Sequence, residues 1–255
     1  MSSYGLWLSA AGMKVNDHRQ AVLANNMANV HTTGFKQDLA IVTQRKVESR
    51  EDAYPFDLQH PVLDGLAGGV NVRESFHDFS QGAVEQTGKP LDVAMMEDGF
   101  FVVSDGTKER YTRDGAFAVN AEGELVLSAA NGRWRVLDEG GARIEISPDL
   151  PEPTVSEDGT IRQGEDAIGR LQTVTFADKQ SLRKAGENVF EATDEKPEAA
   201  NARMQAGALE SSNFDVMTGL ASMIEATRAY EMNANLLRMQ DEMTGRVVST
   251  VGRLN

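Results

Sequence analysis

Apolar residues near the start of the chain recur mostly at intervals of three, four or seven, and no proline interrupts them from about Tyr4 to Val30. That spacing places them on one side of a helix and predicts a helix with one apolar face. The helix should end near Asn29, because the turn-forming run VHTTG follows and Gly34 suits a left-handed backbone position. The chain is then expected to change direction at Phe35. The apolar row consists of Leu8, Ala11, Val15, Val22, Leu23, Met27 and Val30.

A longer pattern runs from Val216 to Val251, in a row whose members alternate at intervals of four and three. The preceding SSNFD offers Ser or Asn caps for a helix start. A helix over this range would be about 54 Å long at ~1.5 Å per residue, which is too long for a compact domain of this size to cover. Two members of the row, Asp241 and Thr244, are polar. The row is Val216, Leu220, Met223, Thr227, Tyr230, Ala234, Leu237, Asp241, Thr244, Val248 and Val251.

Between these segments the hydrophobic period changes to two. The stretch from Gly99 to Ser128 alternates β-rich runs with the turn pairs Asp105-Gly106, Asp114-Gly115 and Glu122-Gly123, which is typical of a meander of hairpins. Gly, Asp and Pro turns separate the further strand candidates. These candidates are Arg133–Val136, Ile144–Ile146, Thr160–Arg162 and Leu171–Phe176.

The patterns together predict an α+β protein in which long N- and C-terminal helices, forming a coiled-coil-like pair, flank a central all-β domain. We expect an N-terminal helix segment over residues 1–35, an extended connector over 36–66, the β domain over 67–212 and the C-terminal helix segment over 213–255. The two helices can pair only if the chain folds back beside the β domain.

The charge and composition of the chain exclude some classes of function. The 255-residue chain has a formal charge of −14, which argues against a nucleic-acid binder. Residues 1–50 carry +3 and residues 216–255 carry 0, which leaves −17 on residues 51–215, so the ends can approach copies of themselves. No apolar run approaches the roughly 20 residues of a membrane helix, and we expect no membrane insertion. No cleavable secretion signal is visible, which on these grounds alone favours a cytoplasmic protein.

The residues that commonly carry chemistry form no familiar arrangement. The chain has no cysteine, which excludes disulfides, thiolate metal sites and a cysteine nucleophile. The pair Gly88-Lys89 lacks the upstream glycine of a phosphate loop, and no G-x-S-x-G elbow occurs. None of the histidines has metal-ligand spacing to another. We therefore expect no catalytic residues, no cofactor and no metal site, and a protein that is not an enzyme; the histidines are His18, His31, His60 and His77.

Several short stretches, taken in order, resemble the flagellar basal-body rod and hook family. The resemblance spans both termini and the central hairpins, although Met27 stands where that family usually has leucine. The length and the short middle region look like a rod protein, while features of both proximal and distal rod proteins are present. The stretches are ANNMANVHTTGFK (24–36), LDVA (91–94), DGFF (98–101), YTRDGAF (111–117), LESSN (209–213) and MIEATRAYEMN (223–233).

The resemblance implies a self-assembling structural subunit of the flagellar axle that transmits torque and forms part of the export-channel wall. It also implies export through the flagellar type III apparatus without signal cleavage, a place in the periplasmic rod, and contacts with its own copies and with neighbouring rod and hook proteins. A different class remains open, namely a secreted or surface coiled-coil adhesin whose acidic β domain binds a ligand.

The same reading gives candidate subunit contacts on both terminal segments. Apolar side chains of the C-terminal helix should pack on those of the N-terminal helix of the same or a neighbouring chain, and buried asparagine amides should penalise subunits that dock out of register. The alternative is that the asparagines are exposed cap residues. In an isolated chain, we expect residues 1–35 and 216–255 to be largely disordered or loosely helical. The candidates are Leu8, Val15, Val22, Asn25, Asn26, Met27, Asn29, Phe35, Leu220, Met223, Ile224, Tyr230 and Leu237.

Overall fold

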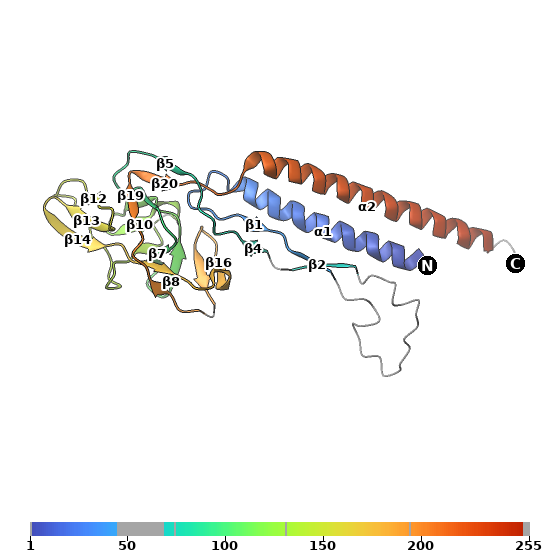
Figure 1. Ribbon diagram of the computed structural model, residues 1–255, viewed down its shortest axis with the longest axis horizontal. Helices are drawn as coiled ribbons and strands as arrows, with labels where there is room; N and C mark the ends of the chain where they lie inside the picture. Colours follow the sequence, from blue (N-terminus) through green and yellow to red (C-terminus); the bar gives the residue numbers. More distant parts are fainter. Residues whose placement is uncertain (1, 45–68, 74, 131, 194, 252–255) are drawn as a thin grey trace, which may run out of the picture. The chain divides into compact units, whose positions relative to one another are not determined.

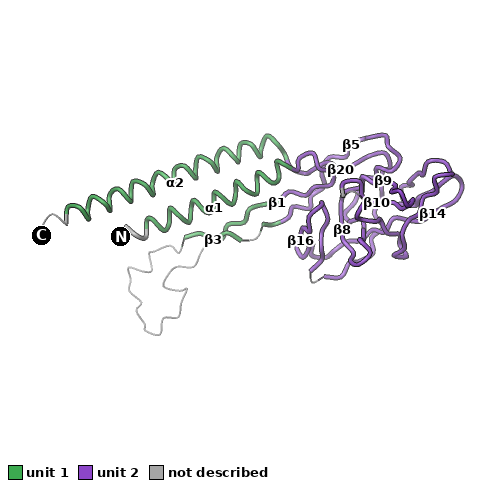
Figure 2. The backbone as a smooth tube through the Cα atoms, turned by 180° about the vertical axis from the view of Figure 1, so that it is seen from behind, with its two compact units in different colours: residues 1–28, 38–76, 215–255 green, residues 29–37, 77–214 purple. Residues whose placement is uncertain are grey.

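The computed structural model describes residues 2–44, 69–73, 75–130, 132–193 and 195–251. The chain divides into two compact units (Figure 2). Unit 1 comprises residues 1–28, 38–76 and 215–255, and unit 2 comprises residues 29–37 and 77–214. Terminal helices flank a strand-rich middle, which confirms the predicted α+β class.

Unit 1 is built on two long helices, α1 (Ser2–Ala28) and α2 (Val216–Val251), which lie side by side (Figure 1). They run antiparallel, because Gly5 lies against Gln240 and Gly12 lies against Asn233. The start of α2 is capped by Asp215, whose Oδ1 accepts a hydrogen bond from the backbone N–H of Thr218 at 2.7 Å. The observed bounds of α2 are those of the predicted apolar row.

A short ribbon completes unit 1 on the side of α1. Strand β2 (Val42–Gln44) pairs antiparallel with β3 (Val70–Val72), and both β1 (Asp38–Leu39) and β3 contact α1. Strand β4 (Phe76–His77) follows where the chain passes into unit 2. Of the predicted connector, the part from residue 45 to residue 66 lies outside the described residues, whereas its first part contains β1 and β2.

Unit 2 is an all-β body whose largest sheet has the strand order β16-β17-β8-β7-β11-β10-β9, with β15 paired to β7 and β18 paired to β15. Smaller groups are β12-β13-β14, β19-β6 and β20-β5. Two single-turn 3₁₀ helices, Ser128–Ala130 and Lys179–Ser181, connect strands. The strands are β5 (Val84–Gln86), β6 (Val93–Met95), β7 (Phe100–Ser104), β8 (Glu109–Thr112), β9 (Phe117–Val119), β10 (Leu125–Leu127), β11 (Arg135–Val136), β12 (Thr154–Val155), β13 (Thr160–Gln163), β14 (Asp166–Arg170), β15 (Thr173–Thr175), β16 (Leu182–Lys184), β17 (Phe190–Ala192), β18 (Glu198–Ala199), β19 (Met204–Ala206) and β20 (Ala208–Glu210).

Strand β7 organises the core, because both of its faces are buried. Phe101 and Val103 point into one hydrophobic cluster, and Phe100 and Val102 point into a second cluster on the opposite face. This is the alternation of successive side chains along a strand. A continuous apolar run, FFVV, therefore fits a central strand that is covered on both sides.

Two of the three predicted hairpin turns are confirmed and one is wrong. Asp105-Gly106 joins the paired strands β7 and β8, and Glu122-Gly123 joins β9 and β10. Asp114-Gly115 does not close a hairpin, because β8 pairs with β7 and β17 while β9 pairs with β10. Gly115 instead accepts the backbone N–H of Val93 at 3.0 Å, so this segment leaves the sheet to contact β6.

Three of the four further strand candidates contain strands, namely β11, β13 and β15. The stretch Ile144–Ile146 forms only an isolated bridge between Glu145 and Glu124, flanked by one between Arg143 and Leu137. Its two isoleucines are buried in the core all the same. Burial therefore follows the alternating pattern here even where a regular ladder does not form.

Candidate assembly site

The inner face of α2 packs on α1 through a row with alternating intervals of four and three. Each member of this inner row is buried or half-buried. Glycines of α1 permit the close approach, because an added Cβ on Gly12 would lie 3.0 Å from Oδ1 of Asn233, and one on Gly5 would lie 2.8 Å from Nε2 of Gln240. The inner row is Gly219, Met223, Ala226, Tyr230, Asn233, Leu237, Gln240 and Thr244.

This inner row differs from the row expected from the sequence. The two share Met223, Tyr230, Leu237 and Thr244, and the expected Val216 and Ala234 are half-buried as well. The inner row also includes Gly219, Ala226, Asn233 and Gln240, which were not members of the expected row. The expected Leu220, Thr227, Asp241 and Val248 are exposed. The physical reason is that α1 offers glycines where the amide side chains of α2 fit, so the helix turns its small and polar positions inward.

Large apolar side chains are consequently left on the outside of α2. The members of this outer row are between 39% and 76% exposed. Four of them are methionines, whose flexible side chains adapt to irregular surfaces. A helix with one apolar row packed and a second one open has an unused contact surface. The outer row is Met217, Leu220, Ile224, Met232, Leu236, Met239, Met243 and Val247.

The predicted apolar contacts on α1 are largely occupied within unit 1. Val15 and Val22 are buried, and Leu8 and Met27 are half-buried. On α2, Ile224 is exposed with Leu220, whereas Met223, Tyr230 and Leu237 are half-buried in the inner row. The expectation that both ends are loosely helical in an isolated chain in solution stays a prediction.

The three predicted asparagines lie in three different environments. Asn25 is exposed on α1. Asn26 is buried and binds the backbone of β1 twice, because its Nδ2 donates to the Asp38 carbonyl at 2.8 Å and its Oδ1 accepts the Asp38 N–H at 2.9 Å. Asn29 belongs to unit 2, where its carbonyl accepts the N–H of Thr32 at 3.1 Å. Asn26 thus holds β1 on α1 within one chain.

A buried polar cluster in unit 2, which we call the clasp, surrounds the segment that follows α1. Lys36 is fully buried, and its Nζ lies 2.5 Å from Oε1 of Glu210 and 2.6 Å from the Ser80 carbonyl. The N–H of Gly82 also donates to Oε1 of Glu210, and Nε of Arg113 lies 3.8 Å from Oε2. Burial lowers the pKa of Lys36, and the Glu210 carboxylate opposes that lowering.

Backbone contacts lock the same segment in place. Gly34 has a φ of +65° and donates its N–H to the Glu210 carbonyl at 2.6 Å, and a Cβ at this position would collide with the backbone of Arg113. Phe35, a predicted subunit contact, is buried in unit 2, where Nζ of Lys184 lies 4.0 Å from the centre of its ring. The clasp therefore needs a glycine at one position and a buried cation at another.

Three further hydrogen bonds extend the clasp. Oγ1 of Thr33 donates to Oδ1 of Asp114 at 2.6 Å, and burial raises the pKa of that carboxyl while the Thr33 hydrogen bond lowers it. Oδ1 of Asn213 accepts the N–H of Gln37 at 2.8 Å, and its Nδ2 donates to the Asp78 carbonyl at 2.8 Å. Sequence reasoning missed these pairs. Part of their signal was present, because Asp114 lies in the stretch YTRDG and Asn213 lies in LESSN.

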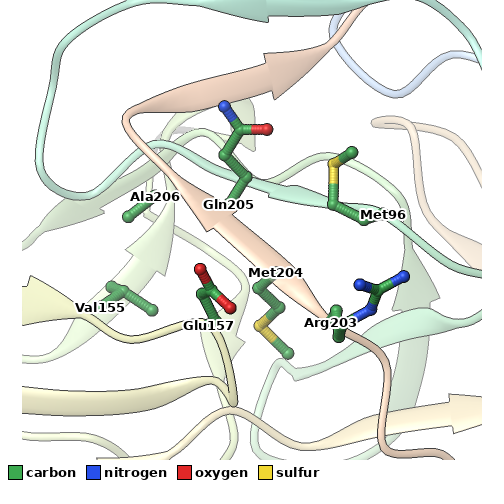
Figure 3. Close-up of a pocket in the computed structure, with 7 residues that line it drawn as sticks. All are labelled: Met96, Val155, Glu157, Arg203, Met204, Gln205 and Ala206. Carbon is green, nitrogen blue, oxygen red and sulfur yellow. The ribbon is translucent and has the colours of Figure 1, made fainter.

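A shallow cavity of about 490 Å³ lies beside β19 in unit 2 (Figure 3). Its lining contributes one carboxylate, that of Glu157, and one guanidinium, that of Arg203, which already pairs with Glu97 at 2.7 Å. The remaining lining side chains are Met96, Val155, Met204, Gln205 and Ala206, and they bring no nucleophile to the cavity. The cavity therefore has few reactive groups among its lining side chains.

No described helix has an apolar stretch of the length and hydropathy needed to cross a bilayer. Among the same residues, no three His, Cys, Asp or Glu side chains gather closely enough to hold a metal ion.

Comparisons with known families match most of the chain in three parts. Residues 9–36 match the family described as flagella basal body rod protein, residues 94–163 match the flagellar hook protein FlgE/F/G D1 domain, and residues 205–250 match the flagellar basal body rod FlgEFG protein C-terminal family. The first match covers most of α1 and the start of the clasp, and the last covers most of β19, all of β20 and nearly all of α2.

Individual relatives cover nearly the whole chain. Flagellar basal-body rod protein FlgF of Caulobacter vibrioides is 36% identical over 92% of this chain and 92% of its own length. Flagellar basal-body rod protein FlgG of Agrobacterium fabrum is 31% identical over 95% of this chain and 97% of its own length. The FlgG protein of Buchnera aphidicola subsp. Schizaphis graminum is 30% identical, over 93% and 96%.

Proposed function

This chain belongs to the flagellar basal-body rod protein family and is a structural subunit of the rod, and we propose that it joins neighbouring subunits through the outer faces of its two terminal helices. The observation that carries the proposal is the outer row of α2, eight large apolar side chains exposed on a helix whose opposite face is already packed.

The energetics favour assembly only when most of that row is covered. Burying one Met- or Leu-sized side chain contributes about 1.5–3 kcal/mol. Bringing two proteins together costs an estimated 4–15 kcal/mol in lost freedom of motion. Two or three buried side chains therefore barely offset the lower end of that cost, whereas a full row exceeds most of the range. We expect stacking to be cooperative for this reason.

The clasp suits a part that transmits torque. Residue 28 ends α1 and residue 29 begins the clasp segment, so a force on the helix passes along the backbone to the buried pair of Lys36 and Glu210. Partners that are buried and hydrogen-bonded resist separation, because parting them leaves an unpaired charge in the interior. We propose that the clasp is the mechanical anchor of the N-terminal segment.

The wider assignment follows from family membership. We propose that the subunit contacts its own copies and neighbouring rod and hook proteins, passes through the flagellar export apparatus without signal cleavage, and takes its place in the periplasmic part of the basal body. Its role is structural rather than catalytic, which the sparse chemistry of the β19 cavity supports. Its acidic charge supports the expectation that nucleic acid is not a partner. The family comparisons give no support to the adhesin alternative.

Electron microscopy of purified basal bodies that carry a tagged copy of this chain tests the function directly. We expect the label along the rod, and its height reports whether the subunit is proximal or distal. The matched variants Met232→Asp, in the outer row, and Ala121→Asp, on the exposed surface of unit 2, should separate assembly from folding. Label absent from the rod in the unmodified chain, or incorporation that is equal for both variants, would contradict the proposal.

A further inference from the structure

Two buried carboxyl groups in unit 2, those of Asp92 and Asp114, lie close together. Asp92 is 5% exposed and Asp114 is 0% exposed. An isolated antiparallel bridge pairs Asp92 with Ala116, which places Asp92 two residues from Asp114 across the ladder. Within the part of the chain that the structure describes, neither carboxyl forms an ion pair with a basic side chain. Like charges that are buried close together without a basic partner are costly, so one of the two must be neutralised.

The hydrogen bonds of Asp114 fit a neutral carboxylic acid. Its Oδ1 accepts one from Oγ1 of Thr33 at 2.6 Å and one from the backbone N–H of Ala116 at 3.0 Å. Its Oδ2 is buried and has no hydrogen-bond partner among the described residues, and the same holds for Oδ2 of Asp92. A carboxylate offers only acceptors, whereas a protonated carboxyl also offers one O–H donor. A proton on Oδ2 of Asp114 would therefore remove one buried charge and provide a donor for the carboxylate of Asp92.

We propose that Asp92 and Asp114 hold one proton between them at neutral pH, and that the loss of this proton to water loosens the attachment of the clasp segment, residues 29–37, to unit 2. Thr33 connects the pair to that segment, because its hydroxyl donates to Asp114 and its carbonyl accepts a hydrogen bond from Nδ2 of Asn188 at 2.6 Å. The inference goes beyond the proposed function and does not depend on it, because the site lies within a single chain.

The environment of Asp114 favours its protonated form. Burial is the largest cause, and it raises the pKa of the carboxyl. The hydrogen bonds from Thr33 and Ala116 lower that pKa, and the charge of Asp92 raises it again. Two carboxyls that share a site retain one proton to a higher pH than a single carboxyl does, because ionising both places like charges at short distance.

The other charged side chains on the elements around the pair are engaged elsewhere or exposed. The guanidinium of Arg113, next to Asp114 in the chain, lies 3.8 Å from Oε2 of Glu210 and donates to the Glu97 carbonyl at 2.8 Å. Lys36 is paired with Glu210 in the clasp. The exposed ones are His31, Lys89 and Glu187. The buried bases thus serve other acceptors, which leaves a proton as the counter-charge for the pair.

The direction of the pH dependence follows from which form of the protein holds the proton more tightly. While the clasp segment is attached, Asp114 is buried and its pKa is raised. When the segment detaches, water reaches the carboxyl and its pKa returns toward the ordinary value. The attached form therefore loses stability as the pH rises from that ordinary value through the raised one. Attachment of the clasp segment should be firmest in mild acid.

Asp158 provides a contrast within the same unit. Its Oδ2 also accepts a threonine hydroxyl, that of Thr160 at 2.8 Å, but Asp158 is exposed and this hydrogen bond lowers its pKa. Asp158 is therefore ionised throughout the neutral range. Replacing it should leave the clasp segment unaffected.

Hydrogen–deuterium exchange of the dilute full chain, measured by mass spectrometry, tests the proposal at the clasp segment. Asp114→Asn is the informative variant, because an amide keeps the acceptor for Thr33 and carries N–H groups where the carboxyl would carry its proton. Comparing the two proteins at the same pH cancels the intrinsic pH dependence of exchange. We expect peptides from residues 29–37 to exchange about tenfold faster in the unmodified chain than in Asp114→Asn at about pH 8, and equally fast at about pH 5.

Asp92→Asn tests the same claim from the other side of the pair. Removing this charge lets Asp114 ionise next to an amide donor, so exchange of the clasp segment at about pH 8 should again be slower than in the unmodified chain. Asp158→Asn is the matched control and should exchange like the unmodified chain at both pH values.

Any of three results would overturn the proton site. One is a ratio of exchange rates between the unmodified chain and Asp114→Asn that is the same at both pH values. Another is an equal effect of Asp158→Asn on the clasp segment. The third is slower exchange of that segment in the unmodified chain on addition of calcium ions, reversed by EDTA, because the pair would then hold a metal cation. None of these measurements involves assembly, so the proposed function is tested separately.

Discussion

The clasp buries charged side chains, whereas the outer row of α2 exposes apolar ones. The clasp encloses a lysine, a glutamate and an arginine in unit 2, where each charge lies within 4 Å of an opposite charge in the same chain. The outer row leaves large apolar side chains in contact with water in unit 1. The first region is complete within one molecule, whereas the second becomes favourable only when something covers it.

The contrast shows that the residues that resemble the rod family need not be the residues that form the contact surface. Gly34, Lys36, Arg113 and Glu210 all lie in the stretches that resemble rod proteins, and all are used inside unit 2. The outer row depends on size and exposure more than on identity, so several apolar residues could serve at each position. The family-like motifs therefore identify buried residues of unit 2, whereas exposed apolar side chains identify the contact surface of α2.

Breaking the clasp should have the largest effect on the stability of unit 2. Lys36→Met removes the cation that lies 2.5 Å from the buried Glu210 carboxylate and leaves only Arg113, at 3.8 Å, beside it, which costs about 3 kcal/mol. Urea unfolding followed by the fluorescence of Trp134, a buried core residue, measures it in a Trp7→Phe background. The double variant Lys36→Met/Glu210→Met should recover only part of the loss, because it removes the unpaired carboxylate but also takes a partner from Arg113 and the acceptor from the Gly82 N–H. A loss below about 1 kcal/mol in the single variant would contradict a clasp that holds unit 2 together.

Gly34→Ala should be the next most disruptive change. A side chain at a φ of +65° costs about 1–2 kcal/mol, and the collision with the Arg113 backbone adds to that cost. Gly88→Ala is the matched control, because Gly88 has a φ of +74° and nothing within 4 Å of an added Cβ. The same unfolding measurement compares them. Equal losses at the two glycines would mean that strain alone matters and that the tight approach at Gly34 does not.

Acid should weaken unit 2 through its surface ion pairs to a smaller extent. A hydrogen bond from Arg135 at 2.6 Å, aided by one from Arg143 at 2.9 Å, lowers the pKa of Glu124. A carboxyl with a lowered folded pKa contributes stability above its unfolded pKa and loses it as the pH falls through the folded value. The free energy of unfolding should therefore fall between pH 5 and pH 3, and less steeply in Glu124→Gln. Parallel pH profiles of the two proteins would remove Glu124 from the explanation.

Changes in the helices should leave the stability of unit 2 unaltered. Leu220→Asp in the outer row and Met223→Asp in the inner row should both abolish assembly, with Trp134-detected unfolding shifted by less than about 0.5 kcal/mol. Only Met223→Asp should also reduce helical content by circular dichroism, because Met223 lies in the face that packs on α1. A large loss of unit 2 stability in either variant would mean that the helix belongs to the β-domain core.

The sequence carried the architecture because its periodicities are long and regular. The bounds of α2 and the hairpins at Asp105-Gly106 and Glu122-Gly123 follow from local pattern and turn chemistry. Which row of α2 turns inward could not be predicted, because the choice depends on Gly5 and Gly12, more than 200 residues away. The hairpin expected at Asp114-Gly115 failed for a similar reason, since contacts with Thr33 and Val93 take priority over local pairing.

The candidate site was predictable in part for the same physical reasons. Apolar spacing identified the helices that carry it, but spacing cannot tell a packed side chain from an open one, as Met223 and Leu220 show. The asparagines were harder still. The partner of Asn26 is the backbone of β1. A pattern of side chains cannot predict such a contact, because every residue carries the same backbone groups.

Methionine oxidation mapped by mass spectrometry tests the central claim most directly, because the chain contains its own controls. In the dilute monomer, brief peroxide treatment should oxidise Met217, Met232, Met239 and Met243, together with exposed Met96 on unit 2, and should spare buried Met95 and Met204. In the assembled state, we predict strong protection of the four α2 methionines and none of Met96. Equal oxidation of the α2 methionines in both states would show that the outer row is not the surface through which subunits join.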